Sequence, residues 1–581
     1  MLNTSIYIPS ILTLDAIKNV WKVGLCIGFG LLFVFISVPN AGANNDSSTK
    51  FSPKVDVEKF VDQMSLEEKV GQLFILGFQG QSFNPQIHEK IKKIKPGAFI
   101  FFGRNVKKLR QTHKLTENIR SHSSLYPFQM IDQEGGVVSR IKSFPPPPSA
   151  LAMGQAKNLM YVKTVSKLTS NILTDLGFNF NLAPVADLSN PYEKNFMGNR
   201  SFGDNPAAVA SMLTEFAMEH EKNSVIATFK HFPGHGGIAG DSHKMTPINK
   251  KSKEELYKHD MSPFQHVAQF DFPTAIMTAH VSYPALDPSG LPATFSEPIL
   301  KGILRNEFKY KGLIISDDLE MYGAEVKGDI GDRAIKALNA GVDMVMVAWS
   351  HNRQMKAYRK VLNAVRQGDI ELSRLNQKVL RILKTKQRVW YPPVKHNPIE
   401  AVKHSLARLK DIGSKIIEAN FNSSPKLVGK SIEHISQAKK VYFYTSSWSL
   451  YQNLKDQVGT KLKYIPLKPG QKVNFSVLKS RDQVGLFYVS GLGTARILQR
   501  MPSRLRNKIL VVNGTYPGII QNASEYAGVL HLNSQHNQLG QWIKNAVDEI
   551  HKRKKRLRQP ASEVTSHHKK RSKKKRSHNP I

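Results

Sequence analysis

The chain has 581 residues, which is too long for one small domain and suits two or three folded units. A hydrophobic fraction of 40% is ordinary for a globular protein with a full core, and a net charge of +38 favours contact with anionic surfaces. The single cysteine, Cys26, lies in an N-terminal segment that we expect to be removed. Cysteine-based zinc sites and thiol catalysis are therefore excluded.

The N-terminus is typical of an export signal. Lys18 and Lys22 precede an apolar run over residues 23–38, and Ala41-Gly42-Ala43 offers a small-residue cleavage site. Residues 1–43 are expected to be a signal peptide. A retained anchor helix is the alternative, although the run falls short of the ~20 residues that span a bilayer. In either case the protein is expected to be exported, whether periplasmic, secreted or anchored facing outside the cytoplasm. Residues 44–54 are polar and form a linker.

Residues 55–392 alternate short apolar runs with longer amphipathic stretches such as 160–175 and 207–220. Eight apolar runs are strand candidates, most of them β-branched or aromatic as in buried parallel strands. They cover residues 73–78, 98–102, 128–131, 178–185, 225–229, 274–278, 313–315 and 342–348. Eight strand-then-helix units predict an α/β fold, a (β/α)8 TIM-like barrel. A doubly wound open sheet has the same periodicity and remains an alternative.

A second, smaller α/β domain is predicted over residues 393–550. It begins with a helical stretch over residues 399–419, and apolar runs return at 441–444, 484–489, 509–512 and 529–532. This domain carries no motif that indicates chemistry, so its role is unassigned. Residues 551–581 are dominated by Lys and Arg with almost no apolar partners, which predicts a disordered basic tail.

Ionisable residues recur where predicted strands end. Asp132 follows the third strand, Lys230 and His231 follow the fifth, His280 ends the sixth and Asp317 ends the seventh. In a (β/α)8 barrel the carboxyl ends of the strands form the active-site mouth. Scattered surface charge would not produce this arrangement repeatedly, so the pattern argues for an enzyme.

The segment from Asp132 to Arg140 reads DQEGGVVSR. Its Gly pair makes a tight turn, and the Asp and Arg suit sugar hydroxyls, although an ordinary loop with a local ion pair is equally compatible. The segment from Lys230 reads KHFPGHGG and is followed by Asp241-Ser-His243. Asp241 is placed to hold the His243 imidazole in one tautomer, and His243 then moves a proton near neutral pH.

Two other interpretations of the histidine-rich loop stay open. His231, His235 and His243 could ligate a metal, although they flank a Pro-Gly turn and no HExxH motif is present. They could equally be solvated histidines of a structural loop. After the seventh strand, in SDDLEM, the Asp317 carboxylate can attack an anomeric carbon or stabilise an oxocarbenium ion, and Asp318 could cap the next helix.

Taken in order, the motifs DQEGGxVxR, NRSFG, KHFPGHG, DSH and SDDLEM resemble the β-N-acetylhexosaminidase branch of glycoside hydrolase family 3 over residues 60–350. The resemblance implies that Asp317 is the nucleophile and that His243, with Asp241 as partner, is the general acid/base. It implies a sugar-binding set of Asp132, Arg140, Arg200, Lys230 and His231. It also implies that neither a metal nor another cofactor is needed.

The resemblance further implies retaining, exo-acting release of terminal N-acetylglucosamine from peptidoglycan or chitin fragments by double displacement. Transfer of the sugar to phosphate stays open, as do the choice between the two substrates and the oligomeric state. A non-catalytic cell-wall or carbohydrate-binding protein on the same barrel is the main alternative. The charge also raises a nucleic-acid-binding role, but no nucleic-acid motif is recognisable, so only non-specific attraction of the tail to a polyanion or an anionic envelope surface is expected.

Overall fold

The computed structural model describes residues 54–141, 147–190, 197–235, 246–389 and 397–422, together with shorter stretches between residues 438 and 531. Within these residues, parallel strands close a barrel in the order β1-β10-β9-β8-β7-β6-β3-β2. β1 pairs with β10 on one side and with β2 on the other, so this sheet has no free edge. The (β/α)8 barrel is confirmed, and the open doubly wound sheet was the wrong alternative.

Each barrel strand overlaps one of the eight apolar runs. The strands are β1 (Phe74–Leu76), β2 (Ala98–Phe101), β3 (Phe128–Ile131), β6 (Phe180–Asn181), β7 (Ile226–Phe232), β8 (Thr274–Thr278), β9 (Leu313–Asp318) and β10 (Met344–Val347). Among the residues of these eight strands, Asp317 alone is not fully buried. These strands are nearly continuous apolar runs in the sequence, because side chains fill the inside of the barrel and helices cover its outside.

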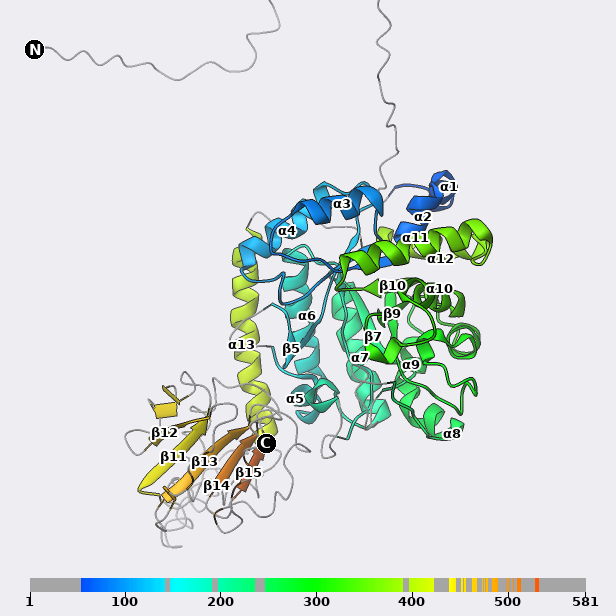
Figure 1. The fold of residues 1–581 in the computed structure, drawn as a ribbon. Helices are drawn as coiled ribbons and strands as arrows, with labels where there is room; N and C mark the ends of the chain where they lie inside the picture. Colours follow the sequence, from blue (N-terminus) through cyan, green and yellow to red (C-terminus); the bar gives the residue numbers. More distant parts are fainter. Residues whose placement is uncertain are drawn as a thin grey trace, which may run out of the picture. The chain divides into compact units, whose positions relative to one another are not determined.

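Helices form the outer layer of the barrel (Figure 1). In chain order they are α1 (Val57–Gln63), α2 (Leu66–Gln72), α3 (Pro85–Lys93), α4 (Leu109–Ser121), α5 (Ala150–Gln155), α6 (Leu159–Asp175), α7 (Pro206–Glu221), α8 (Lys253–Glu255), the π-helical turns η2 (Leu256–Asp260) and η4 (Pro298–Glu307) on either side of α9 (Ser262–Val267), then α10 (Ile330–Ala340), α11 (His351–Gln367) and α12 (Leu372–Arg388). The helices predicted over 160–175 and 207–220 correspond to α6 and α7.

Local sequence signals explain where several of these helices begin and end. The Asn84 and Asn205 side chains accept a hydrogen bond from the first turns of α3 and α7, and each is followed by proline at the first helical position. Gly368 ends α11 with a φ of 85°, a left-handed conformation that costs glycine little. These caps fix helix boundaries without help from the barrel.

The chain beyond the barrel contains α13 (Pro398–Asn422), which packs along α6 and α5. The Asn420 Nδ2 donates to the Ala152 carbonyl of α5 at 2.9 Å. A five-stranded parallel sheet then has the order β12-β11-β13-β14-β15, formed by β11 (Lys440–Thr445), β12 (Leu462–Pro466), β13 (Gln483–Val489), β14 (Ile509–Asn513) and β15 (Gly528–His531). The smaller α/β domain is confirmed.

The sequence missed β12 because it is an edge strand that is only partly buried and ends at Pro466, so it has no continuous apolar run. The predicted signal segment, linker and basic tail lie outside the described residues. In the part of the chain that is described, no helix is long and apolar enough to cross a membrane.

Candidate active site

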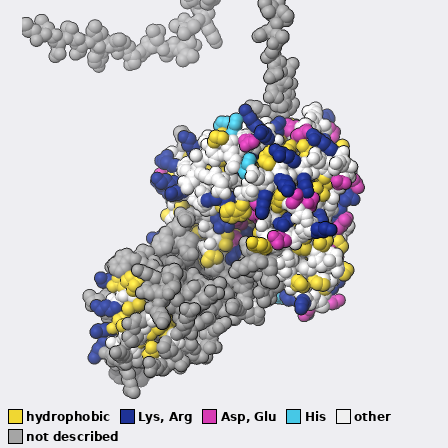
Figure 2. Space-filling model, in the orientation of Figure 1, with side chains coloured by type: hydrophobic (Ala, Val, Ile, Leu, Met, Phe, Trp, Pro, Cys, Tyr) yellow, Lys and Arg dark blue, Asp and Glu magenta, His cyan; other side chains and the backbone are white. Residues whose placement is uncertain are grey.

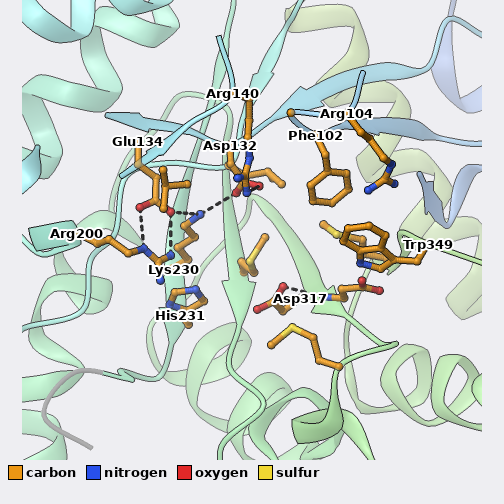
Figure 3. A pocket seen from close by; sticks show the side chains of 17 residues that line it. Phe102, Arg104, Asp132, Glu134, Arg140, Arg200, Lys230, His231, Asp317 and Trp349 are labelled. Atoms are coloured by element: carbon orange, nitrogen blue, oxygen red, sulfur yellow. Dashed lines mark hydrogen bonds and ion pairs between the residues drawn. The ribbon is translucent and has the colours of Figure 1, made fainter. Parts of the chain in front are cut away.

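A cavity of about 480 Å³ opens at the carboxyl ends of the barrel strands. Six of the residues singled out from the sequence line it together: Asp132, Arg140, Arg200, Lys230, His231 and Asp317 (Figure 3). Asp241 and His243 lie outside the described residues, so their placement stays a prediction.

Asp317 lies at the carboxyl end of β9 and keeps access to the cavity. Its Oδ1 accepts a hydrogen bond from the Asp318 N–H at 2.8 Å. Burial alone would raise the pKa of this carboxyl, but the nearby His280 and His231, this N–H and Lys230 lower the pKa below its usual value. Asp317 is therefore an ionised carboxylate at neutral pH, on the floor of a cavity, as a nucleophile needs to be.

Asp318, in contrast, is protonated at neutral pH. It is buried, and burial together with the negative charges of Glu320 and Asp317 raises the pKa of its carboxyl to about 8. The expectation that Asp318 caps the next helix is wrong, because α10 is capped by Asp329. Instead, the Asp318 Oδ1 accepts hydrogen bonds from the N–H groups of Glu320 at 3.1 Å and Ala348 at 3.2 Å, which ties the turn after β9 to the end of β10.

A buried network of ion pairs forms one wall of the cavity. The Lys230 Nζ contacts the Asp132 Oδ1 at 3.0 Å and the Glu134 Oε1 at 2.7 Å. Arg200 binds both oxygens of Glu134 at 2.8 and 2.9 Å. Burial works against the charge of Glu134, but Arg200 and Lys230 hold the pKa of its carboxyl well below the usual range. These groups are fixed before any ligand arrives.

A small hairpin supplies the acidic half of this network. β4 (Gln133–Gly135) pairs with β5 (Val138–Ser139) directly after β3, and Arg140 then returns to contact the Asp132 Oδ2 at 3.1 Å. The Gln133 side chain accepts hydrogen bonds from the Arg140 and Ile141 N–H groups at 2.9 and 3.1 Å. The turn needs Gly135 and Gly136, which both have positive φ. The Gly pair noted in the sequence thus places Asp132, Glu134 and Arg140 together.

Lys230 and His231 are consecutive in β7, yet both line the cavity. In a regular strand neighbouring side chains point to opposite faces, but the pairing of β7 with β8 shifts register between Lys230 and Phe232. The His231 Nδ1 contacts the Asp187 Oδ2 at 2.7 Å, and the Asp187 Oδ1 accepts the N–H groups of His231 and His235. Asp187 therefore sets the orientation of the His231 ring.

Two other histidines, His280 of the predicted rim and His235 of the histidine-rich loop, do not line the cavity. His280 is buried, with its Nδ1 2.8 Å from the Thr294 Oγ1 and its Nε2 3.1 Å from the Asp318 carbonyl. His235 is also buried, and burial together with the charge of His231 lowers its pKa to about 4. Among the described residues, no cluster of three His, Cys, Asp or Glu is arranged to hold a metal ion.

Several lining or supporting residues were not selected from the sequence. Glu134 is inside a quoted motif, Asp187 follows the fourth strand, Phe102 and Arg104 follow the second, and Trp349 follows the eighth. Applying the strand-end rule to every strand, including those followed by arginine or an aromatic residue, would have marked these positions as candidates without showing what they contact.

The arrangement combines an ionised carboxylate, a wall of fixed donors and acceptors, and an aromatic rim. Closely spaced, fixed charged groups suit a ligand with many hydroxyl groups. An ionised carboxylate inside the cavity can act as a nucleophile at a carbon atom of that ligand. Fold and cavity together define a barrel enzyme whose site is built for a glycan.

The comparisons identify the family. Residues 65–385 match the glycosyl hydrolase family 3 N-terminal domain, which is more than half of the chain. The chain therefore belongs to glycosyl hydrolase family 3, and it is a glycoside hydrolase that acts on O-glycosyl bonds.

The similar proteins share this region. A beta-hexosaminidase of Photobacterium profundum is 36% identical over 282 residues, which are 48% of this chain and 82% of that protein. Beta-hexosaminidase A of Pseudoalteromonas piscicida is 31% identical over 332 residues, covering 52% of this chain and 55% of that protein. The solved structure of a glycoside hydrolase family 3 beta-N-acetylglucosaminidase from Paenibacillus has a TM-score of 0.69 at 25% identity, covering 84% of this chain and 97% of that one.

Proposed function

We propose that this protein is a retaining, exo-acting β-N-acetylhexosaminidase that releases terminal N-acetylglucosamine from peptidoglycan or chitin fragments. The observation that carries the proposal is Asp317, an ionised carboxylate that faces the cavity opposite a preformed hydroxyl-binding wall. The names of the relatives, beta-hexosaminidase and beta-N-acetylglucosaminidase, support the choice of sugar.

The reaction proceeds by two displacements at the anomeric carbon. An Asp317 oxygen forms a bond to this carbon while the bond to the leaving oxygen breaks, and His243 gives its proton to that oxygen. His243, now neutral and oriented by Asp241, then takes a proton from water. The water oxygen displaces Asp317 and releases the sugar with its original anomeric configuration.

The buried wall supplies the positioning that this chemistry requires. Lys230, Arg200 and Arg140 offer N–H donors, and Asp132 and Glu134 offer acceptors, to the hydroxyls of the terminal sugar. Because the ion pairs hold these side chains in place, little orientational freedom is lost when the sugar binds. The anomeric carbon is thereby kept over Asp317.

The decisive experiment compares a chromogenic β-N-acetylglucosaminide with the matching β-glucoside. We expect turnover of the first alone, and loss of at least a thousandfold in Asp317→Asn with an unchanged melting temperature. Asp369→Asn is the matched control, because Asp369 is exposed and outside the cavity. Equal rates on both substrates would contradict the proposed specificity, and full activity in Asp317→Asn would contradict the mechanism.

The same assay separates the remaining alternatives. Binding of N-acetylglucosamine oligomers without turnover would favour a non-catalytic carbohydrate-binding protein. Addition of inorganic phosphate distinguishes the two possible acceptors, because water gives free N-acetylglucosamine whereas phosphate gives the sugar phosphate.

We also propose that the protein is exported and that residues 551–581 bind an anionic envelope surface. The composition of the tail supports this, whereas Lys and Arg on the visible barrel face are interspersed with Asp and Glu (Figure 2). A version that ends at residue 550 should lose co-sedimentation with anionic vesicles at low salt and keep hydrolysis of the small substrate. Unchanged sedimentation would exclude the tail as the anchor.

A further inference from the structure

Residues 236–245 carry Asp241 and His243 and lie outside the described residues, but the chain is described on both sides of them. The chain reaches them from β7 and continues at Thr246. On both sides it contacts residues 279–283, the segment that directly follows β8 and that we call the β8 loop. The proposed mechanism gives the β8 loop no role.

The β8 loop holds the chain that enters residues 236–245. The Tyr283 hydroxyl donates a hydrogen bond to the Gly234 carbonyl at 2.7 Å, and the Tyr283 side chain is fully buried. On the next residue, the Asp187 Oδ1 accepts the N–H of His235 at 2.6 Å. The backbone before residues 236–245 is therefore fixed by two side chains from other parts of the barrel.

The residue beside Tyr283 holds the chain on the other side. The Ser282 N–H donates to the Pro247 carbonyl at 2.9 Å, and the Ser282 carbonyl accepts the Asn249 N–H at 2.9 Å. The Thr246 hydroxyl donates to the Gly323 carbonyl at 3.2 Å, in the turn that follows β9. The chain that leaves the segment is thus attached both to the β8 loop and to the loop after β9.

The contact between Tyr283 and Gly234 is closely fitted. Gly234 has a φ of 131°, which other residues rarely adopt, and a Cβ at this position would lie 2.7 Å from the Cβ of Asp260. Burial, together with the charges of Asp187 and Asp260, raises the pKa of the Tyr283 phenol well above its usual value. The hydroxyl is therefore a hydrogen-bond donor throughout the pH range in which the protein is folded.

These anchors restrict where the acid/base can lie. Fixing both ends of a loop reduces the positions that its residues can reach, and His243 precedes Thr246 by three residues. The entering strand carries His231, which lines the cavity near Asp317. A general acid must come within hydrogen-bond reach of the leaving oxygen, so a small displacement of either anchor changes the rate of proton transfer.

We propose that Tyr283 is a positioning residue of the reaction, because its bond to the Gly234 carbonyl keeps the segment that carries His243 within reach of the leaving oxygen. Thr246 has the same role at the other end of the segment. This inference rests on the proposed function, in which His243 is the acid/base. Tyr283 does not line the cavity, so its loss should impair proton transfer more than sugar binding.

The first test compares two leaving groups on the same sugar. The 2,4-dinitrophenyl β-N-acetylglucosaminide releases a weakly basic phenolate that needs little help from an acid, whereas the phenyl β-N-acetylglucosaminide releases a more basic phenolate that needs a proton. We expect Tyr283→Phe to lower kcat/KM by about tenfold to 100-fold for the phenyl substrate, a part of what a general acid contributes, and by less than about threefold for the dinitrophenyl substrate.

The second displacement gives an independent measurement. With the dinitrophenyl substrate, the slow step in the variant is release of the sugar from Asp317, because the base that activates water is misplaced. Azide attacks the same carbon without losing a proton, displaces Asp317 and gives the β-glycosyl azide. We therefore expect azide to raise the kcat of Tyr283→Phe toward the wild-type value, which a loss of stability alone would not produce.

A matched control is Tyr310→Phe. Tyr310 is also buried, and its hydroxyl donates to the Leu313 carbonyl at 3.3 Å, at the amino end of β9 and away from the cavity. This variant should keep the wild-type rates on both substrates. Thr246→Val should show the same leaving-group dependence as Tyr283→Phe, and Thr246→Ser, which retains the hydroxyl, should behave as wild type. Melting temperatures establish folding, and if Tyr283→Phe is not folded, the two Thr246 variants decide.

An equal fall on both substrates in folded Tyr283→Phe would overturn the inference, as would wild-type rates on both or a kcat that azide does not restore. A failure of the proposed function has a different result. If His243→Ala itself lacks the leaving-group dependence, or if the wild type cleaves neither N-acetylglucosaminide, the assignment of the acid/base or of the activity is wrong.

Discussion

Glu134→Gln is the substitution that tests the buried ion-pair wall most directly. Glu134 is 4% exposed in its side chain, and it contacts Arg200 at 2.8 Å and Lys230 at 2.7 Å. Glutamine has the same shape but no charge, so Arg200 and Lys230 would each lose the charged partner that Glu134 provides. Removing one partner of a buried pair costs about 3–5 kcal/mol, because the remaining charge stays desolvated. We expect a loss of this size in the free energy of unfolding, measured by urea denaturation.

The matched control is Glu89→Gln. Glu89 pairs with Lys93 at 2.9 Å on the surface of α3, where both side chains are at least one third exposed. Exposed pairs of this kind contribute about 0–1 kcal/mol. A loss in Glu134→Gln no larger than in Glu89→Gln would refute the reasoning, because it would show that burial of the network does not matter.

The effect should also depend on pH with a defined sign. The cations hold the pKa of Glu134 in the folded protein below its value of 4.5 in a model peptide. The stability that this carboxylate contributes is therefore fully present above about pH 4.5 and is lost as the pH falls toward the folded pKa. The difference between wild type and Glu134→Gln should be constant from pH 6 to 8 and should shrink below pH 4.

Three further outcomes are expected. Asp187→Asn should lower turnover on the order of 100-fold with the fold retained, because the His231 ring loses its carboxylate partner at 2.7 Å; wild-type kinetics would contradict this. The pKa of Asp318 is raised to about 8 in the folded protein, so ionisation favours the unfolded chain as the pH rises. The wild type should therefore lose about 4 kcal/mol of stability relative to Asp318→Asn between pH 5 and pH 8. A wild type that becomes more stable than Asp318→Asn over this range, as measured by melting temperature, would exclude this. Activity should survive EDTA, and loss restored by zinc would favour the metal alternative for the histidine loop.

The barrel could be predicted from the sequence because its strands are buried on both faces. A strand such as β10 (Met344–Val347) has no polar side to interrupt its apolar run, so composition and spacing reveal it directly. The edge strand β12 is only partly buried, has the adjacent Lys463 and Tyr464 near its centre, and gives no such signal. The closure of the sheet could not be predicted in this way, because pairing of β1 with β10 joins residues that are far apart in the sequence.

Several residues of the candidate site could be predicted from the sequence, but the contacts between them could not. The motifs identify Asp132, Lys230 and Arg200, yet they do not show that Glu134 joins the last two. Asp187 was missed because it acts on His231 across the cavity wall, and a single carboxylate near a strand end is not a signal by itself. Arg104 was missed because its partners are backbone carbonyls and aromatic rings, which leave no trace in a sequence motif.

Asp317 and Asp318 show most clearly what the structure adds to the sequence. The two residues are identical and adjacent, and the pairing of β9 with β10 shifts register at this point, so that both reach the cavity lining. Their surroundings then separate them: histidines and a lysine favour the charged form of Asp317, whereas burial beside Glu320 favours the neutral form of Asp318. A nucleophile must be both ionised and accessible. Asp317 meets both conditions, while Asp318, protonated and engaged with two backbone N–H groups, instead holds in place the strand end on which Trp349 sits.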